Sequence, residues 1–301
     1  MLATLTDGER LVCADYSRAL HEDLTGTAKH VDLWLLIENR GRWDADAPGG
    51  LPEPAQAWCR TLRGRFPLMR VAFIARPDRR TGPLRVLAAD VRNEPPILAR
   101  FEVERIEDVA QLDVLRPMVL ETGPCFFVCT HGTHDLCCAR YGHPIFRAMA
   151  DLAESDVWQI SHVGGCRFAP NLICLPQGAV YGRIDPWDCG PLVRSARRDR
   201  LYLPKLRGRC CFSPAIQAAE VLLRRRIGMT RRGALRLVTA QEEPPAHWCV
   251  DFEVTGTKRV YRVECSREPA GMATYRNCVA DQETPRQRFR LVRCVRINEG
   301  G

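Results

Sequence analysis

The sequence lacks a hydrophobic run long enough to span a membrane, although 46% of its 301 residues are hydrophobic. Its apolar stretches, such as VDLWLLIE (31–38) and CFFVC (125–129), have the length of buried strands. The N-terminus also lacks a basic start followed by an apolar stretch, which a secretory signal requires. We therefore expect a cytoplasmic protein that has no membrane partner.

The cysteines lack the regularity of a disulfide framework, because the fifteen cysteines are odd in number and irregularly spaced. In a reducing compartment, most of them are expected to be small buried apolar side chains. Six have no sequence neighbours of the metal-binding type and are expected to be packing residues: Cys13, Cys59, Cys249, Cys265, Cys278 and Cys294.

A net charge of +8 comes from an excess of arginine. A basic surface favours acidic partners. No aromatic ladder and no known nucleic-acid motif accompanies the arginines, so we do not expect nucleic acid as a partner. The arginine-rich segments are instead typical of solvated helix faces: 194–200, 207–209 and 224–232.

Residues 1–116 are predicted to form an N-terminal α/β domain with the order β-α-β-β. Residues 93–116 are expected to be its connector to the next domain, with a short helix. The elements of this order are a buried strand at 31–38, a helix at 55–66 with an apolar face, and strands at 69–77 and 84–92.

Residues 117–230 are predicted to form a second domain with the same β-α-β-β order. A helix that crosses between parallel strands resembles thioredoxin, so the first domain is expected to be a degenerate thioredoxin-like repeat. Pro144 favours a helix start, because proline fits the first helical position, and apolar residues follow at helical spacing through Ala153. The strands are expected at 125–130 and 157–161, followed by a hairpin of 171–175 and 180–184.

Residues 231–301 are predicted to form a small α+β C-terminal region. Ser213 and Pro214 favour the start of a preceding helix that runs to Arg226. Strands are expected at 234–238, 248–254 and 260–263.

Two segments in the middle of the chain carry residues typical of a metal site. One offers Cys129 and Cys138, and the other offers His162 and Cys166 across a Gly-Gly turn that suits a sharp bend. Thiolate and imidazole are common ligands of iron-sulfur clusters and of zinc. Because Cys129 and His162 follow strands predicted to be parallel, we expect both at the same edge of the sheet.

The neighbours of these residues are less clearly assigned by the sequence. The spacing does not choose between Cys137 and Cys138 as the ligand. His131 and His134 are expected to surround the site rather than to bind the metal. Asp135 is expected to cap the turn or to accept from a nearby amide.

The chain carries the motifs CTHGTHDLCC (129–138), VWQISHVGG (157–165), FAPN (168–171) and YGR (181–183). Together they resemble the sucrase/ferredoxin-like family, which is related to thioredoxin-like [2Fe-2S] ferredoxins. The resemblance is strong over roughly residues 120–225 and loose over the rest of the chain. It implies a fold with a thioredoxin-like ferredoxin domain, preceded by the similar β-α-β-β unit and followed by the α+β region.

Carried over residue by residue, the resemblance implies that Cys129, Cys138 and His162 bind a [2Fe-2S] cluster. Cluster-binding members have a second histidine after Gly-Gly, and many bacterial relatives have an acidic residue there, whereas this chain has Cys166. Cysteine also binds iron, so we expect a Cys3His site. No carboxylate pair accompanies the motifs, so we expect no glycosidase activity.

The leading hypothesis is an electron-transfer protein that serves a redox partner with an acidic docking surface. Arg167, Arg207 and Arg209 are candidates for favouring the reduced cluster or for docking. Three alternatives stay open at this point. A structural zinc site has the ligand set but an unusual Cys-x8-Cys spacing. A thiol-disulfide oxidoreductase lacks a Cys-x-x-Cys at a helix start, and a cluster-less binding protein would keep only the fold.

Overall fold

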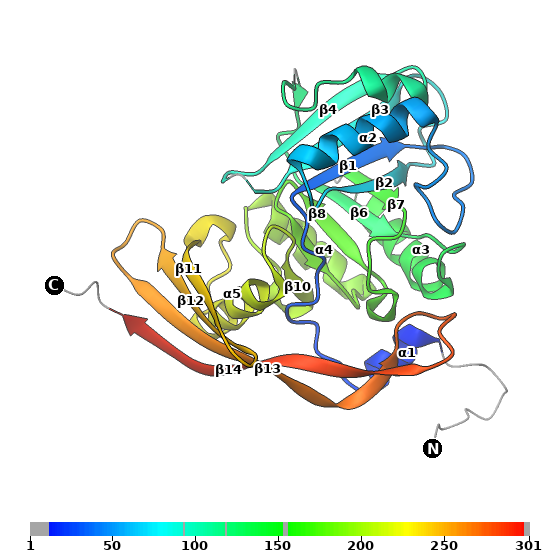
Figure 1. The fold of residues 1–301 in the computed structure, drawn as a ribbon. Coiled ribbons are helices and arrows are strands. Elements are labelled where there is room, and N and C mark those ends of the chain that lie inside the picture. The colour runs from blue at the N-terminus through cyan, green and yellow to red at the C-terminus, as the bar shows by residue number, and fades with distance from the viewer. Residues whose placement is uncertain (1–11, 93, 118, 153–155, 298–301) are drawn as a thin grey trace.

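The computed structural model describes residues 12–92, 94–117, 119–152 and 156–297. Most of the N-terminal segment assessed for a signal, and Ala153 of the predicted helix, lie outside these residues. The described strands form a ten-stranded sheet and a separate four-stranded sheet (Figure 1).

The N-terminal unit has the predicted β-α-β-β order. Its strand order in the sheet is β2-β1-β3-β4, with β1 parallel to β2 and antiparallel to β3. β4 occupies part of the segment expected to be a connector, while the short 3-10 helix η1 confirms the helical part of that prediction. The elements are β1 (Leu33–Glu38), α2 (Glu53–Arg65), β2 (Arg70–Ala75), β3 (Leu84–Asp90), β4 (Ile97–Val103), η1 (Ile106–Gln111) and β5 (Val119–Leu120).

The second unit repeats this arrangement, with the strand order β7-β6-β8-β9. β6 is parallel to β7 and antiparallel to β8, which confirms the thioredoxin-like order. β2 pairs antiparallel with β7, so both units belong to one continuous sheet. The boundary near residue 116 stays a prediction. The elements are β6 (Cys125–Cys129), α3 (Leu136–Ala150), β7 (Asp156–Ile160), η2 (Cys166–Phe168), β8 (Leu172–Leu175) and β9 (Ala179–Tyr181).

The start of helix α3 was predicted wrongly. The helix begins at Leu136 rather than at Pro144, which lies inside it. Asp135 caps the helix, because its carboxylate accepts from the backbone N–H of Cys137 at 2.9 Å. Proline removes one backbone donor but does not end this helix. The earlier start places Cys137 and Cys138 in the first helical turn rather than in a loop.

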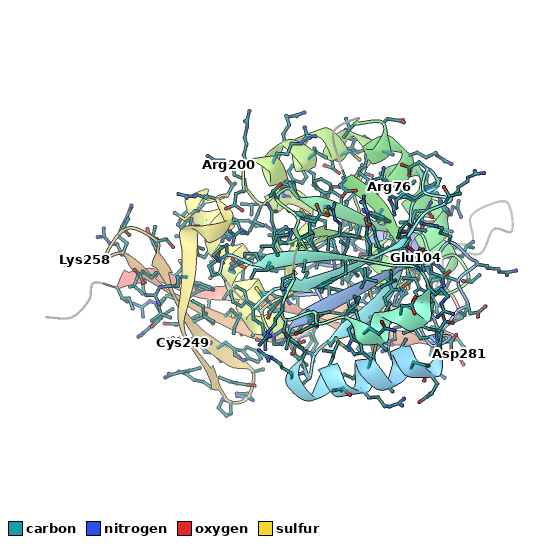
Figure 2. The ribbon with its side chains drawn as sticks, turned by 90° about the horizontal axis from the view of Figure 1, so that it is seen from above. Arg76, Glu104, Arg200, Cys249, Lys258 and Asp281 are labelled. Carbon is teal, nitrogen blue, oxygen red and sulfur yellow. The ribbon has the colours of Figure 1, made fainter. Side chains whose placement is uncertain are left out.

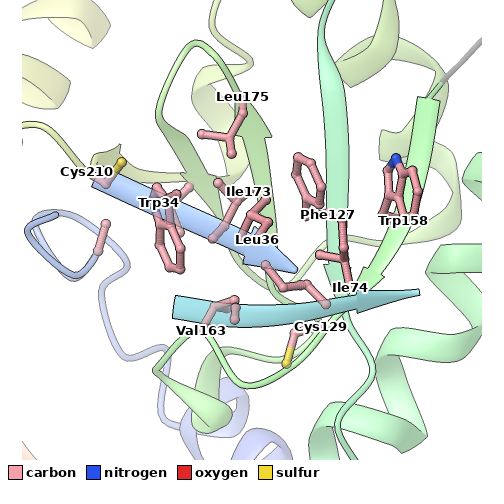
Figure 3. Packing of buried hydrophobic residues seen from close by; sticks show 14 of the residues in the cluster. Trp34, Leu36, Ile74, Phe127, Cys129, Trp158, Val163, Ile173, Leu175 and Cys210 are labelled. Atoms are coloured by element: carbon pink, nitrogen blue, oxygen red, sulfur yellow. The ribbon is translucent and has the colours of Figure 1, made fainter. Parts of the chain in front are cut away.

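Alternate side chains of the strands enter different cores. Trp34 and Leu36 of β1 join Phe127 and Cys129 of β6 in a core shared by both units (Figure 3). Phe126 and Val128 instead pack with side chains of α3 and of helix α4 (Pro186–Arg197). The shared core fixes the end of β6, where Cys129 is 1% exposed.

The helix predicted from Ser213-Pro214 is confirmed as α5, and it packs its apolar face against the second sheet. Helix α4 and strand β10, which precede it, were not predicted. These elements are α4 (Pro186–Arg197), η3 (Leu203–Lys205), β10 (Leu206–Arg209) and α5 (Pro214–Ile227).

The C-terminal region forms an antiparallel sheet in the order β11-β12-β13-β14. Its first three strands were predicted, but β13 is much longer than expected and β14 was missed. Figure 2 shows Cys249 and Lys258 on this sheet. The elements are η4 (Arg232–Ala234), β11 (Leu235–Glu243), β12 (His247–Val254), β13 (Val260–Tyr275) and β14 (Glu283–Ile297).

The long β13–β14 hairpin reaches back to the N-terminal helix α1 (Cys13–Ala19) (Figure 1). Tyr16 of α1 donates a hydrogen bond to Glu283 of β14 at 2.6 Å. Segments from the two ends of the described chain therefore lie side by side, next to α3. No helix in the described part of the chain has the length and apolar character needed to cross a membrane.

Candidate metal centre

The structure brings together the four residues that the sequence predicted as ligands. Cys129 is the last residue of β6 and pairs with Ile160, the last residue of the parallel strand β7. The ligand atoms of Cys129, Cys138 and His162 all lie within 4.8 Å of one another. The Sγ of Cys166 lies 3.5 Å from Nδ1 of His162. Three thiols and one imidazole therefore converge at the carboxyl edge of the two parallel strands.

Close packing of α3 against β6 positions two of these thiols. A Cβ at Gly142 of α3 would lie 2.0 Å from the carbonyl oxygen of Cys129, so only glycine permits this approach. Asp135 fixes the first turn of α3 as its cap. Cys138 of that turn thereby faces the end of β6.

The Gly-Gly loop positions the other two ligand residues. Gly164 and Gly165 have φ angles of 96° and 80°, which L side chains rarely adopt. Arg207 donates to the carbonyl oxygen of Gly164 at 3.1 Å, and Asn171 donates to that of Gly165 at 2.9 Å. The loop is thus held in the sharp bend that the sequence indicated, and it returns Cys166 toward His162.

Cys137 and Cys138 face different neighbours, which separates the two candidates that the sequence left open. Consecutive helical residues point about 100° apart. Cys138 belongs with Cys129 and His162. Cys137 instead lies 3.5 Å from the Sγ of Cys13 and 3.1 Å from that of Cys278.

Cys13 and Cys278, which the sequence assigned to packing, do pack in the hydrophobic core, but they also lie beside other possible ligands. Both lie with Cys137 and Asp135 in a group whose ligand atoms are all within 4.8 Å of one another. The contacting residues are separated by 124 to 265 positions in the chain. No local spacing in the sequence signals such a group.

His131 and His134 attach the N-terminal unit to the site. The buried His131 accepts from the backbone N–H of His162 at 3.1 Å and donates to the carbonyl oxygen of Asp44 at 2.8 Å. His134 donates to the carbonyl oxygen of Ala45 at 2.7 Å and stacks on His162 with ring centroids 3.8 Å apart. A ring nitrogen of His134 also lies within 4.8 Å of the ligand atoms of His162 and Cys166. His134 is therefore closer to the candidate ligands than the sequence suggested.

The electrostatics of the site favour thiolates at Cys129 and Cys166, whereas hydrogen bonds to these two residues raise the pKa of Cys138 well above its ordinary value. A hydrogen bond from Cys138, together with His162, lowers the pKa of Cys129 well below its ordinary value. The same two partners lower the pKa of Cys166 to about 7. Burial lowers the pKa of His162, but hydrogen bonds to Cys129 and Cys166 outweigh burial and raise it to about 9. A metal ion would replace the imidazolium proton as the charge that stabilises these thiolates.

A cavity of about 680 Å³ opens beside the site, with His162 and Cys166 in its wall. Burial and the neighbouring arginines lower the pKa of Lys29, which shows how closely the cations converge. The cavity is therefore suited to an anionic group or an acidic surface. Six cationic side chains line it: Lys29, Arg70, Arg167, Arg207, Arg276 and Arg286.

The three arginines singled out from the sequence have different surroundings. Arg207 is 2% exposed and holds the Gly-Gly loop. Arg209 is also buried and forms an ion pair with Glu220 at 2.9 Å. Arg167 lines the cavity and pairs with Glu22 at 2.8 Å. Of the three, only Arg167 retains appreciable exposure.

Comparisons with known proteins give one family and one distant structure. The model of the sucrase/ferredoxin-like family matches residues 24–208. A solved thioredoxin-like [2Fe-2S] ferredoxin from Aquifex aeolicus matches 25% of this chain and 80% of its own, with 19% identity and a TM-score of 0.22. No curated protein matches the chain.

Proposed function

The chain belongs to the sucrase/ferredoxin-like family, and from that membership we propose that it is an electron-transfer protein with a [2Fe-2S] cluster. The proposed ligands are Cys129, Cys138, His162 and Cys166. The observation that carries the proposal is the convergence of these four side chains at one sheet edge. The set of three thiols and an imidazole fits the cluster, because its cysteines are buried and lowered pKa values favour the thiolates of Cys129 and Cys166, to which the Cys138 thiol donates.

When bound, such a cluster accepts and donates one electron. The protein would supply the ligands and control access to them. Cys129 and Cys138 are 1% exposed, which shields that side of the site from water. His162 and Cys166 line the basic cavity, so electrons would enter and leave on their side. His131 and His134 would fix the position of His162 through the contacts described above.

The cationic cavity supports an acidic redox partner. Lys29 and Arg276 are exposed at the cavity, where they would attract a negatively charged docking surface. The same cations would stabilise the added negative charge of a reduced cluster. The expected compartment remains the cytoplasm, a proposal that the fifteen free cysteines support.

Iron and acid-labile sulfide analysis of anaerobically purified protein tests the proposal, together with a visible spectrum. We expect a brown protein with about two iron and two sulfide per chain. Cys129→Ser is expected to lose both, whereas Cys249→Ser on β12, away from the site, keeps them. A colourless protein without iron or sulfide after reconstitution would overturn the proposal.

A structural zinc ion is the second candidate at this site. The ligand atoms of Cys129, Cys138 and His162 lie within 4.8 Å of one another, which also suits a single tetrahedral ion. Metal analysis separates the two candidates, because zinc gives no visible colour and no paramagnetic signal on reduction. A dithiol enzyme is not favoured, because Cys137 and Cys138 face different groups. Full iron content in Cys166→Ala would remove Cys166 from the ligand set.

A further inference from the structure

A second group of thiols lies on the other side of the first turn of α3. It consists of Cys13 from α1, Cys137 from α3 and Cys278 from the loop between β13 and β14. The Sγ atoms lie 3.5 Å apart for Cys13 and Cys137, 3.1 Å for Cys137 and Cys278, and 3.6 Å for Cys278 and Cys13. Three sulfurs from distant parts of the chain thus form a nearly equilateral triangle.

Asp135 supplies an oxygen beside this triangle. Its ligand atom and the three sulfurs all lie within 4.8 Å of one another. Its two carboxylate oxygens accept from the backbone N–H groups of Cys137, at 2.9 Å, and Cys278, at 2.8 Å. These hydrogen bonds fix the carboxylate between the two segments and leave each oxygen a further lone pair.

The group consists of three thiols and one carboxyl group, and all of it is buried except the half-buried Cys278. Cys13, Cys137 and Asp135 are each at most 2% exposed. Three thiols and a carboxyl group in one buried place are stabilised most directly by a shared cation.

We propose that Cys13, Cys137 and Cys278 bind one Zn²⁺ ion, with Asp135 as the fourth ligand. A zinc–sulfur distance of about 2.3 Å sets sulfur–sulfur separations of roughly 3.8 Å in a tetrahedron. The observed separations of 3.1 to 3.6 Å would have to widen by roughly 0.2 to 0.7 Å to reach this value. A closed set of four protein ligands is typical of structural zinc, and zinc accepts both thiolate and carboxylate ligands.

The ion would fasten the two ends of the described chain to α3. Cys13 and Cys278 are separated by 265 positions in the sequence, and both contact Cys137 of α3. The residue after Cys137, Cys138, faces the first site. A carboxylate oxygen of Asp135 also lies within 4.8 Å of the Sγ atoms of Cys138 and Cys166. The zinc site would thereby hold α1 and the β13–β14 hairpin over the first turn of α3.

Zinc and iron analysis of the full-length chain, purified under reducing conditions with zinc supplied, tests the proposal. The wild type is expected to hold about one zinc per chain. The double variant Cys13→Ser/Cys278→Ser is expected to lose zinc and keep iron. Cys129→Ser/Cys138→Ser is expected to lose iron and keep zinc, and the control Cys249→Ser/Cys294→Ser is expected to keep both.

Three outcomes would overturn the zinc site. The first is a wild type that holds no zinc, and the second is a Cys13→Ser/Cys278→Ser variant that retains zinc. The third is a zinc-free protein whose intact mass is two hydrogens below that of the fully reduced chain, as for a disulfide. A wild type with zinc at this site and no iron supports the inference and removes the proposed cluster function. A wild type with iron and no zinc supports the proposed cluster function and overturns the zinc site.

A second measurement covers the case in which the double variant does not fold. The Cys129→Ser/Cys138→Ser chain, stripped of metal, is titrated anaerobically with Co²⁺. Binding of about one equivalent is expected to produce thiolate-to-cobalt charge transfer and the ligand-field absorption of tetrahedral cobalt, and added Zn²⁺ is expected to abolish both. An absence of charge transfer at saturating Co²⁺ would contradict a thiolate site.

Discussion

Cys137 and Cys138 are adjacent in the sequence, but their thiols belong to different groups. The Sγ of Cys137 lies 3.1 Å from that of Cys278, whereas Cys138 lies with Cys129 and His162. The cause is the helix that begins at Leu136, because its first turn directs the two side chains about 100° apart. One helical turn therefore serves both candidate metal sites.

Alanine substitutions of these two cysteines are expected to affect different metals. Cys138→Ala removes a proposed cluster ligand, so iron and sulfide content should fall strongly. Cys137→Ala removes a thiol from the other group, so iron and visible absorption should stay near the wild-type values. The measurement is iron and sulfide per chain after anaerobic purification. Equal loss of iron in both variants would contradict the division of the two thiols.

Local patterns predicted most elements of the thioredoxin-like units. Buried strands such as β1 and β6 are continuous apolar runs, so their sequence signals are strong. β14 was missed because its sequence, ETPRQRFRLVRCVRI, alternates arginine with apolar residues and most of its side chains are exposed. The start of α3 was misplaced because proline also favours the first turn of a helix, whereas here Pro144 lies inside the helix and Asp135 caps it.

The first candidate site was accessible to sequence reasoning because its residues follow two parallel strands within forty positions. The second was not, because Cys13 and Cys278 meet only after the whole chain has folded. The basic cavity was missed for the same reason, since Lys29, Arg70 and Arg276 are isolated in the sequence. The arginine-rich segments of the sequence pointed instead to Arg209, which pairs with Glu220 inside the fold.

Gly142→Ala is expected to destabilise the protein. The added Cβ would lie 2.0 Å from the carbonyl oxygen of Cys129, so α3 must shift from β6 at a cost of roughly 1–3 kcal/mol in the free energy of unfolding. Gly64→Ala in α2 is the matched control, because no atom lies within 4 Å of its new Cβ. Alanine there is expected to stabilise by about 0.5–1 kcal/mol. Denaturant unfolding measures both, and similar stability changes in the two variants would refute the close approach.

Glu220 is expected to contribute to stability at neutral pH and to lose that contribution in acid. Burial raises the pKa of Glu220, but the guanidinium groups of Arg209 and Arg224, both within 3.0 Å, outweigh burial and lower it below its usual value of 4.5. A carboxylate with a lowered folded-state pKa stabilises the fold above the unfolded-state pKa, and the effect disappears as the pH falls through the folded-state value.

The variant Glu220→Gln is accordingly expected to lose roughly 3–5 kcal/mol of unfolding free energy at pH 7, because it removes the buried carboxylate from Arg224 and leaves Arg209 only the exposed Glu94 at 3.6 Å. The difference from the wild type should shrink below pH 4.5. Glu53→Gln, whose exposed partner is Arg60, serves as the control, with a change of at most about 1 kcal/mol. Denaturant unfolding at a series of pH values measures these free energies. A stability difference between wild type and Glu220→Gln that grows in acid would contradict a lowered pKa for Glu220.

Charge reversal at the cavity is expected to slow electron transfer from an acidic partner. Lys29→Glu and Arg276→Glu place negative charge beside His162 and Cys166, so they should lower the association rate by about tenfold or more at low ionic strength. Lys258→Glu makes the same charge change on the exposed turn between β12 and β13 and should leave the rate nearly unchanged (Figure 2).

Stopped-flow reduction of the cluster by an acidic ferredoxin or flavodoxin at several salt concentrations provides the measurement. Because added salt screens these charges, the variants and the wild type should converge at high salt. Equal rates for all variants at low salt would exclude the cavity as the docking surface.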